Sequence, residues 1–171
     1  SDYSPKNYII RRIDMCGIVG YIGSQNAQSF VLEGLEKLEY RGYDSAGIAV
    51  NTGEDKFNIV KKVGRLRNLA DILEKEPLRG TMAIGHTRWA THGKPSDENS
   101  HPHFNKDETL VVVHNGIIEN YLDLKKELIA KGYEFNSETD TEVVTHLLDE
   151  LYEGDLLEAT KKLIKIIKGA Y

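Results

Sequence analysis

The chain of 171 residues carries 22 Lys and Arg against 27 Asp and Glu, for a formal net charge of −5, and it is 40% hydrophobic and 29% charged. This composition is typical of one folded domain and argues against disorder. No basic stripe or long apolar run is present, so we expect neither nucleic acid nor a membrane as a partner. The single cysteine, Cys16, cannot form an intrachain disulfide, and we therefore expect a cytoplasmic protein.

Strands and helices alternate in the first half of the chain. The short apolar run Gly17 to Ile22 predicts a buried strand, and apolar residues at three-and-four spacing predict a helix over Ala27 to Tyr40. Further strands are predicted at 45–50, 57–63 and 82–88, with a helix at 66–75 that ends before a proline.

The second half begins with a polar stretch, 90–107, that is rich in Gly, Pro, Ser, Asn and His and predicts a long, functional loop. A strand is predicted at 110–114, followed by helices at 119–131, 140–152 and 155–168. Strands interleaved with helices indicate a layered α and β domain. We expect the last helix to pack on a sheet that this chain supplies only in part.

Cys16 stands between Met15 and a glycine-rich strand pattern. A lone cysteine is most often a small core residue. If Met15 were removed, however, the freed α-amine of Cys16, with a pKa of about 7.7 to 8, could take the proton of its own thiol. A peptide nitrogen cannot do this, so the function depends on whether residues 1–15 are present. We interpret 1–15 as a removable leader, residues added in recombinant work or an extension from a mistaken start, and 16–171 as the domain.

Three other short segments carry candidate site residues. Arg88 ends a predicted strand and could bind a carboxylate, or form a surface salt bridge beside a core Trp89. Asn115 and Gly116 could form an oxyanion hole or a simple turn. The acidic segment 137–142 is typical of a helix N-terminus. Together with a thiol, these residues describe a site for an amino acid with an attackable side-chain carbonyl.

Five of the six histidines lie between His86 and His114. They are scattered over a strand, a loop and another strand, whereas zinc sites favour tighter spacing. His101 and His103 are the only close pair. We therefore expect hydrogen bonding in the loop, no metal site and no cofactor.

Five longer motifs are more specific than these fragments. They are CGIVG from Cys16, YRGYDSAG from Tyr40, HTRWATHGKPSDENSHPH from His86, HNGIIENY from His114 and SETDTE from Ser137. Together they resemble the glutaminase domain, of the class II glutamine amidotransferase type, found in the family of glutamine–fructose-6-phosphate aminotransferases (isomerising), or glucosamine-6-phosphate synthases. The resemblance covers Met15 to Tyr171. It implies an α+β fold of the N-terminal nucleophile (Ntn) hydrolase type, a four-layer αββα sandwich, incomplete at its C-terminus in this chain.

The resemblance implies that Cys16 attacks the side-chain amide of glutamine to form a thioester, with Asn115 and the Gly116 N–H as oxyanion hole. In that family the released ammonia converts fructose 6-phosphate to glucosamine 6-phosphate. The implied partners are therefore glutamine or glutamate and a sugar isomerase domain of a longer, homo-oligomeric protein. Because the nucleophile is residue 16 and not residue 1, we expect this form of the chain to be inactive.

The resemblance also assigns residues to substrate binding. Arg88, helped by Thr91 and His92, would bind the α-carboxylate, and Asp140 the α-ammonium. Two further residues match supporting positions: Trp89 resembles the indole that gates the passage of ammonia, and Arg41 lies near the nucleophile. The alternatives are the glutaminase part of another class II amidotransferase, which would differ in the acceptor, and a non-catalytic glutamine- or glutamate-binding module.

Overall fold

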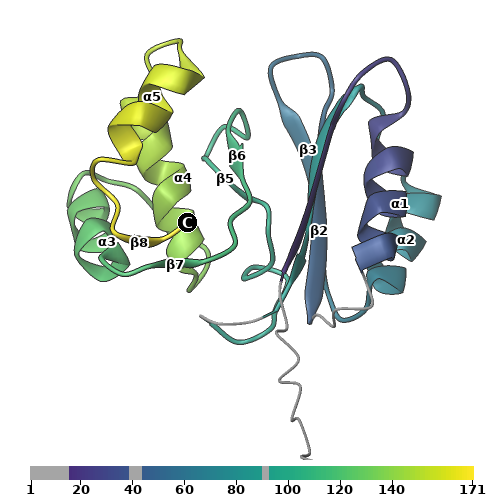
Figure 1. Ribbon diagram of the computed structural model, residues 1–171, viewed down its shortest axis with the longest axis horizontal. Helices are drawn as coiled ribbons and strands as arrows, with labels where there is room; N and C mark the ends of the chain where they lie inside the picture. Colours follow the sequence, from purple (N-terminus) through teal and green to yellow (C-terminus); the bar gives the residue numbers. More distant parts are fainter. Residues whose placement is uncertain (1–15, 39–43, 90–92) are drawn as a thin grey trace, which may run out of the picture.

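The computed structural model describes residues 16–38, 44–89 and 93–171, which form four layers in the order αββα (Figure 1). Helices α1 and α2 cover one face of a four-stranded sheet, and short strands followed by three helices lie on its other face. The elements are β1 (Gly17–Ile22), α1 (Ala27–Leu38), β2 (Ser45–Asn51), β3 (Phe57–Val63), α2 (Leu66–Lys75), β4 (Met82–Arg88), β5 (His103–Phe104), β6 (Val111–Val112), β7 (Ile117–Ile118), α3 (Tyr121–Ala130), α4 (Asp140–Leu151), α5 (Leu156–Leu163) and β8 (Gly169–Ala170).

The main sheet has the strand order β1-β4-β2-β3, and all of its pairings are antiparallel. In this register Gly17 pairs with Thr87, and Ser45 pairs with Arg88. The start of β1, the start of β2 and the end of β4 therefore lie together at one end of the sheet's strands. The second β layer consists of two separate pairs, β5 with β6 and β7 with β8.

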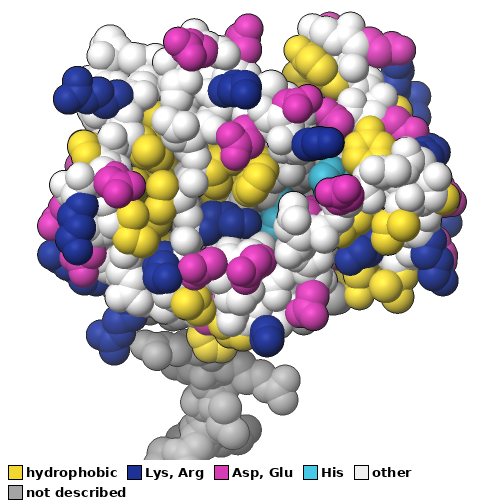
Figure 2. Space-filling model, turned by 180° about the vertical axis from the view of Figure 1, so that it is seen from behind, with side chains coloured by type: hydrophobic (Ala, Val, Ile, Leu, Met, Phe, Trp, Pro, Cys, Tyr) yellow, Lys and Arg dark blue, Asp and Glu magenta, His cyan; other side chains and the backbone are white. Residues whose placement is uncertain are grey.

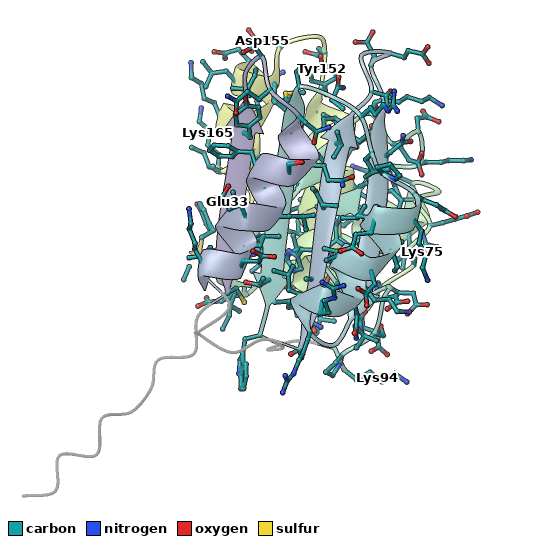
Figure 3. All side chains as sticks on the ribbon, turned by 90° about the vertical axis from the view of Figure 1, so that its right-hand side faces the viewer. Glu33, Lys75, Lys94, Tyr152, Asp155 and Lys165 are labelled. Carbon is teal, nitrogen blue, oxygen red and sulfur yellow. The ribbon has the colours of Figure 1, made fainter. Side chains whose placement is uncertain are left out.

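Two hydrophobic clusters hold the layers together. The first lies between the main sheet and helices α1 and α2, where the apolar stripe of α1 is fully buried at Ala27, Val31 and Leu35. Gly85 of β4 permits this contact, because a Cβ at that position would collide with Val31. Figure 3 looks onto α1 and α2, with Glu33 and Lys75 labelled on them, and shows Lys94 at the opposite end of the molecule from Tyr152 and Asp155.

The second cluster joins β7 to α3, α4 and α5, with members such as Ile118, Leu128, Val143 and Leu163. Between the two clusters, β4, the loop 99–105 and the segment 137–146 bury polar side chains. The two β layers approach closely at Gly47 of β2, where a Cβ would collide with the carbonyl oxygen of His101. The interior is thus polar where the layers meet and apolar on either side.

Several predicted elements differ from the structure. The strand 17–22 is not buried: among the described residues β1 pairs only with β4, at the edge of the sheet, and Ile18 and Ile22 are exposed. The loop 90–107 contains the short strand β5, and of the strand predicted at 110–114 only Val111–Val112 pairs. The helix predicted over 27–40 is helical wherever the structure describes it, at 27–38, and its last two residues lie outside the described residues.

The helix predicted over 155–168 is also shorter than expected, because α5 ends at Leu163. The turn that follows is tightened by bonds from the amides of Lys165 and Ile166 to carbonyls three residues earlier. After this turn the chain changes direction, and β8 pairs antiparallel with β7. No helix in the part of the chain that the structure describes is long and apolar enough to cross a membrane.

Candidate active site

Cys16 lies just before β1 and directly beside Trp89, which follows β4. The backbone N–H of Trp89 donates to Sγ of Cys16 at 3.0 Å, and Sγ lies 3.5 Å from the Trp89 carbonyl oxygen. The N–H of Gly17 donates to Oγ1 of Thr87 at 3.1 Å, which secures the same crossing of strands. The pairing of β1 with β4 therefore determines where the thiol is placed.

The thiol of Cys16 is half-buried. Burial raises the pKa of the Cys16 thiol, while the Trp89 N–H and the charge of Arg88 oppose that rise. Since the pKa stays above the usual value, the thiol is protonated at neutral pH and needs a base before it can act as a nucleophile. The alternative interpretation, that Cys16 is a small residue packed in the hydrophobic core, does not agree with its partial exposure.

Asn115 joins Cys16 from a part of the chain far away in sequence. Its Nδ2 donates to the carbonyl oxygen of Cys16 at 2.9 Å, and its Oδ1 lies 2.8 Å from Nε2 of His86. Gly116 follows with a φ of 147°, which favours glycine, and a Cβ there would collide with the Ala170 carbonyl oxygen of β8. The segment is thus more than a turn: it brings a side-chain amide up to the nucleophile.

Arg88 and Asp140 are both buried, with 3% and 5% of their surfaces exposed. Arg88 is therefore not the surface residue that the salt-bridge alternative required; it donates from Nη2 to the Gly93 carbonyl oxygen at 3.2 Å. Oδ2 of Asp140, at the first position of α4, accepts the Ile118 N–H at 2.7 Å. Burial lowers the pKa of Arg88, and the nearby charges of Asp44, Cys16 and Asp140 counteract this. The cation thus lies within electrostatic reach of both the thiol and the buried carboxylate.

The structure places only some of the remaining predicted residues. Trp89 is 41% exposed, so its indole does not pack in the core. Thr91, His92 and Arg41 lie outside the described residues, as does the segment 1–15.

A row of three buried histidines, His86, His101 and His103, was not predicted from the sequence. His86 stacks on His101, with ring centroids 4.2 Å apart, and His101 meets His103 edge-on at 4.8 Å. Nε2 of His103 lies 2.7 Å from Oγ1 of Thr139, the residue before α4. The density of histidine in this region was visible in the sequence, but the stacking depends on contacts between β4 and the loop. In the described residues no cluster of three His, Cys, Asp or Glu side chains is arranged to hold a metal ion.

A cavity of about 300 Å³ lies beside His103. Its lining includes His103, Lys61, Phe104, Ser137 and Glu142. Burial lowers the pKa of Lys61 to about 8, although Glu142 and Glu98 oppose this. Burial raises the pKa of Glu142, but the His146 imidazole, 3.4 Å away, and hydrogen bonds from Ser137 and Asn136 outweigh it and bring the pKa to about 2. Figure 2 shows basic, acidic and histidine side chains gathered in a hollow on one face of the molecule.

Comparison with known proteins gives the chemistry of the family. Residues 86–171 match the glutamine amidotransferase domain family. The glutamine–fructose-6-phosphate aminotransferase (isomerizing) of Thermus thermophilus is 58% identical over 157 residues, which cover 92% of this chain and 26% of the relative. The enzyme of the same name from Clostridium acetobutylicum is 60% identical over the same shares. The chain thus spans about a quarter of the length of these curated relatives.

Two solved structures support the fold. Glutamine phosphoribosylpyrophosphate amidotransferase from B. subtilis aligns with a TM-score of 0.77 and 32% identity, over 90% of this chain and 33% of its own. A structure described as the allosteric regulatory enzyme of purine biosynthesis aligns with a TM-score of 0.78 and 32% identity, over 90% of this chain and 34% of its own. These likenesses confirm the predicted α+β fold class of the N-terminal nucleophile type.

Proposed function

Since this chain belongs to the glutamine amidotransferase domain family, we propose that its Cys16 site hydrolyses glutamine to glutamate and ammonia. The observation that carries the proposal is the convergence of Cys16, Asn115, Arg88 and Asp140 from distant parts of the sequence. They offer a nucleophile, an amide donor, a cation and an anion. A free amino acid with a side-chain amide needs all four.

The reaction begins when the α-amine of Cys16 takes the thiol proton and sulfur bonds to the amide carbon of glutamine. The carbonyl electron pair moves to oxygen, which accepts hydrogen bonds from Nδ2 of Asn115 and the N–H of Gly116. One of the two Asn115 amide hydrogens binds the Cys16 carbonyl, so the second remains for the substrate. The carbon–nitrogen bond then breaks, the amine returns its proton, ammonia leaves and water hydrolyses the thioester to glutamate.

The proposed chemistry requires a free α-amine on Cys16. The thiol is protonated at neutral pH because burial raises its pKa, and the peptide nitrogen of an internal Cys16 cannot accept a proton. Only a chain that begins at Cys16 carries its own base. In a chain that retains residues 1–15, the thiol therefore lacks this base.

Substrate binding in this proposal divides between two ends of the site. Arg88 binds the α-carboxylate with Thr91 and His92, and Asp140 binds the α-ammonium. The support is that both Arg88 and Asp140 are buried and lie within electrostatic reach of each other. Trp89 and Arg41 keep the gating and supporting roles that the motifs imply, and no cofactor takes part.

For the acceptor we propose fructose 6-phosphate, converted to glucosamine 6-phosphate by a sugar isomerase domain of a longer, cytoplasmic and homo-oligomeric protein. The support is the higher identity to the fructose-6-phosphate aminotransferases, 58–60%, than to the phosphoribosylpyrophosphate amidotransferase, 32%. Glutamine hydrolysis that rises when fructose 6-phosphate is added to the longer protein would support this acceptor. Stimulation by phosphoribosylpyrophosphate instead would assign the chain to the other enzyme.

The test of the site is glutamine hydrolysis by a protein that begins at Cys16. We expect glutamate and ammonia in equal amounts, and no activity from Cys16→Ala. Binding of glutamine without turnover in the protein that begins at Cys16 would contradict the proposal and indicate a non-catalytic binding module.

A further inference from the structure

The side-chain amide of Asn115 is held from both ends. Its nitrogen faces the carbonyl oxygen of Cys16 at 2.9 Å, and its oxygen faces Nε2 of His86 at 2.8 Å. Because a backbone carbonyl oxygen can only accept a hydrogen bond, the nitrogen of the amide must face Cys16. The amide oxygen therefore faces His86, and the imidazole must supply the proton from Nε2.

His86 is well suited to hold this position. It lies in β4, paired with Ile18 on one side and Gly47 on the other, and none of its surface is exposed. Its ring stacks on His101 with an angle of 15° between the planes, so it cannot swing freely. Burial also lowers the pKa of His86 to about 4, so the ring is neutral at physiological pH and carries one proton to donate.

We propose that His86 is a positioning residue for glutamine hydrolysis: it holds the Asn115 amide with Nδ2 toward the position where the oxyanion forms. This inference rests on the proposed function of Asn115 as an oxyanion donor. Without the Nε2–H of His86, the amide can rotate and present its oxygen to a developing negative charge. An acceptor in place of a donor would repel the transition state and leave the bound substrate almost unaffected.

The test compares two substitutions in the protein that begins at Cys16. His86→Phe keeps a ring for stacking but removes the donor, whereas His86→Gln places an amide N–H near the former Nε2. Loss of one oxyanion donor costs about 10²-fold in kcat. We expect His86→Phe to lower kcat by about this factor, with unchanged KM and unchanged glutamate affinity. We expect His86→Gln to retain most of the kcat of the unsubstituted protein. Equal losses in both variants, or a rise in KM without a fall in kcat, would overturn the proposal.

A double-mutant cycle separates positioning from a general loss of structure. If His86 acts through Asn115, then His86→Phe should cost little further kcat when Asn115 is already Ala. Losses that simply multiply would show that the histidine acts independently of Asn115. If Asn115→Ala itself retains full activity, the oxyanion role in the proposed function fails, which is a different outcome from failure of the positioning role alone.

One measurement needs neither turnover nor a variant that folds. Nitrogen-15 NMR of the unsubstituted chain reports which ring nitrogen of His86 carries the proton. We expect a proton on Nε2 at neutral pH, with a hydrogen bond to the Asn115 side chain. A proton on Nδ1 with a bare Nε2 would reverse the donor and acceptor and would overturn the proposal even if glutamine hydrolysis were confirmed.

Discussion

At the scale of single residues, the site consists of groups that can act together only because the fold brings them into contact. Cys16 and Asn115 are far apart in the sequence, yet the amide of one binds the carbonyl of the other. No spacing rule predicts such a contact, because it depends on how β1 and the segment before β7 are placed by the whole fold. The family motifs pointed to both residues, whereas His86 was only one donor in a histidine-rich run until its hydrogen bond to Asn115 was known.

Substrate binding should depend on both buried charges. Removing one partner of a buried charge pair commonly costs about 3–5 kcal/mol, and about 3 kcal/mol corresponds to roughly 100-fold in affinity. We expect Arg88→Ala and Asp140→Asn each to weaken glutamate binding about 100-fold or more in calorimetry. Asn at position 140 keeps an oxygen for the Ile118 N–H, so the local fold is retained.

Arg67→Ala is the matched control for this measurement. Arg67 is an exposed arginine on α2 that pairs with Asp71 on the same helix. We expect it to bind glutamate like the unsubstituted protein. Unchanged affinity in a folded Arg88→Ala protein would contradict the assignment of the carboxylate site.

The buried histidines should make stability depend on pH. Burial lowers the pKa of His86 from 6.5 to about 4 and holds the pKa values of His101 and His103 well below their usual range. Between pH 6.5 and 4 the unfolded chain therefore binds more protons than the native one. Stability is complete above pH 6.5 and falls as the pH drops through this window, by about 3 kcal/mol for His86 alone.

Urea unfolding at pH 7 and pH 5 measures this effect. Glu142 contributes in a separate window, because its pKa of about 2 affects stability only below pH 4.5. A free energy of unfolding that is constant between pH 7 and pH 5 would show that the histidines are more accessible to protons than their burial implies.

At the scale of elements, periodicity predicts the long ones well. The helix 66–75 has the predicted bounds, because its buried leucines, Leu66, Leu69 and Leu73, recur at helical spacing. The strand 82–88 also has the predicted bounds, and it begins with three consecutive apolar residues, 82–84. The short strands β5, β7 and β8 have two residues each, too few for any period to show. The end of α5 was missed because its apolar pattern continues through Ile164 and Ile167, although the chain turns after Leu163 to bring β8 to β7.

Contact between the two β layers should be sensitive to one methyl group. A Cβ at Gly47 would collide with the His101 carbonyl oxygen, so Gly47→Ala must displace the buried loop that carries His101. We expect a lower melting temperature in circular dichroism, with a loss of about 1–3 kcal/mol that is typical of overpacking.

Gly20→Ala is the matched control for this prediction. Gly20 also lies within a strand, β1, but a Cβ there meets nothing within 4 Å. We expect an unchanged or slightly higher melting temperature, since alanine restricts the unfolded chain. Equal effects of the two substitutions would indicate that the loop does not press on β2.

At the scale of the whole molecule, two apolar clusters flank a polar interior. The motifs implied the four layers, but they did not show that the second β layer is two separate pairs or that the histidines lie between the layers. Such features arise from packing between distant segments.

On the side of α4 and α5, a groove of about 670 Å³ is lined by residues such as Phe57, Leu110, Leu148 and Tyr152.

Hydrogen exchange should reveal the unequal stability of the two halves. The central strands β2 and β4 have a hydrogen-bonded neighbour on each side, whereas β7 and β8 form a pair of two residues each. We expect the amides of 46–50 and 83–87 to exchange most slowly and those of β7 and β8 much faster. Uniform protection across both halves would show that the molecule unfolds only as a single unit.

Glutamine hydrolysis at this site depends on Cys16 acting as a nucleophile with its own amine as base. Its most direct test is the intact mass of the protein quenched in acid during turnover of glutamine. A protein that begins at Cys16 should carry one glutamyl group, located by peptide mapping on Cys16, and the form that retains residues 1–15 should carry none. Equal labelling of both forms would contradict the role of the α-amine, and a glutamyl group on any other residue would contradict the assignment of the nucleophile.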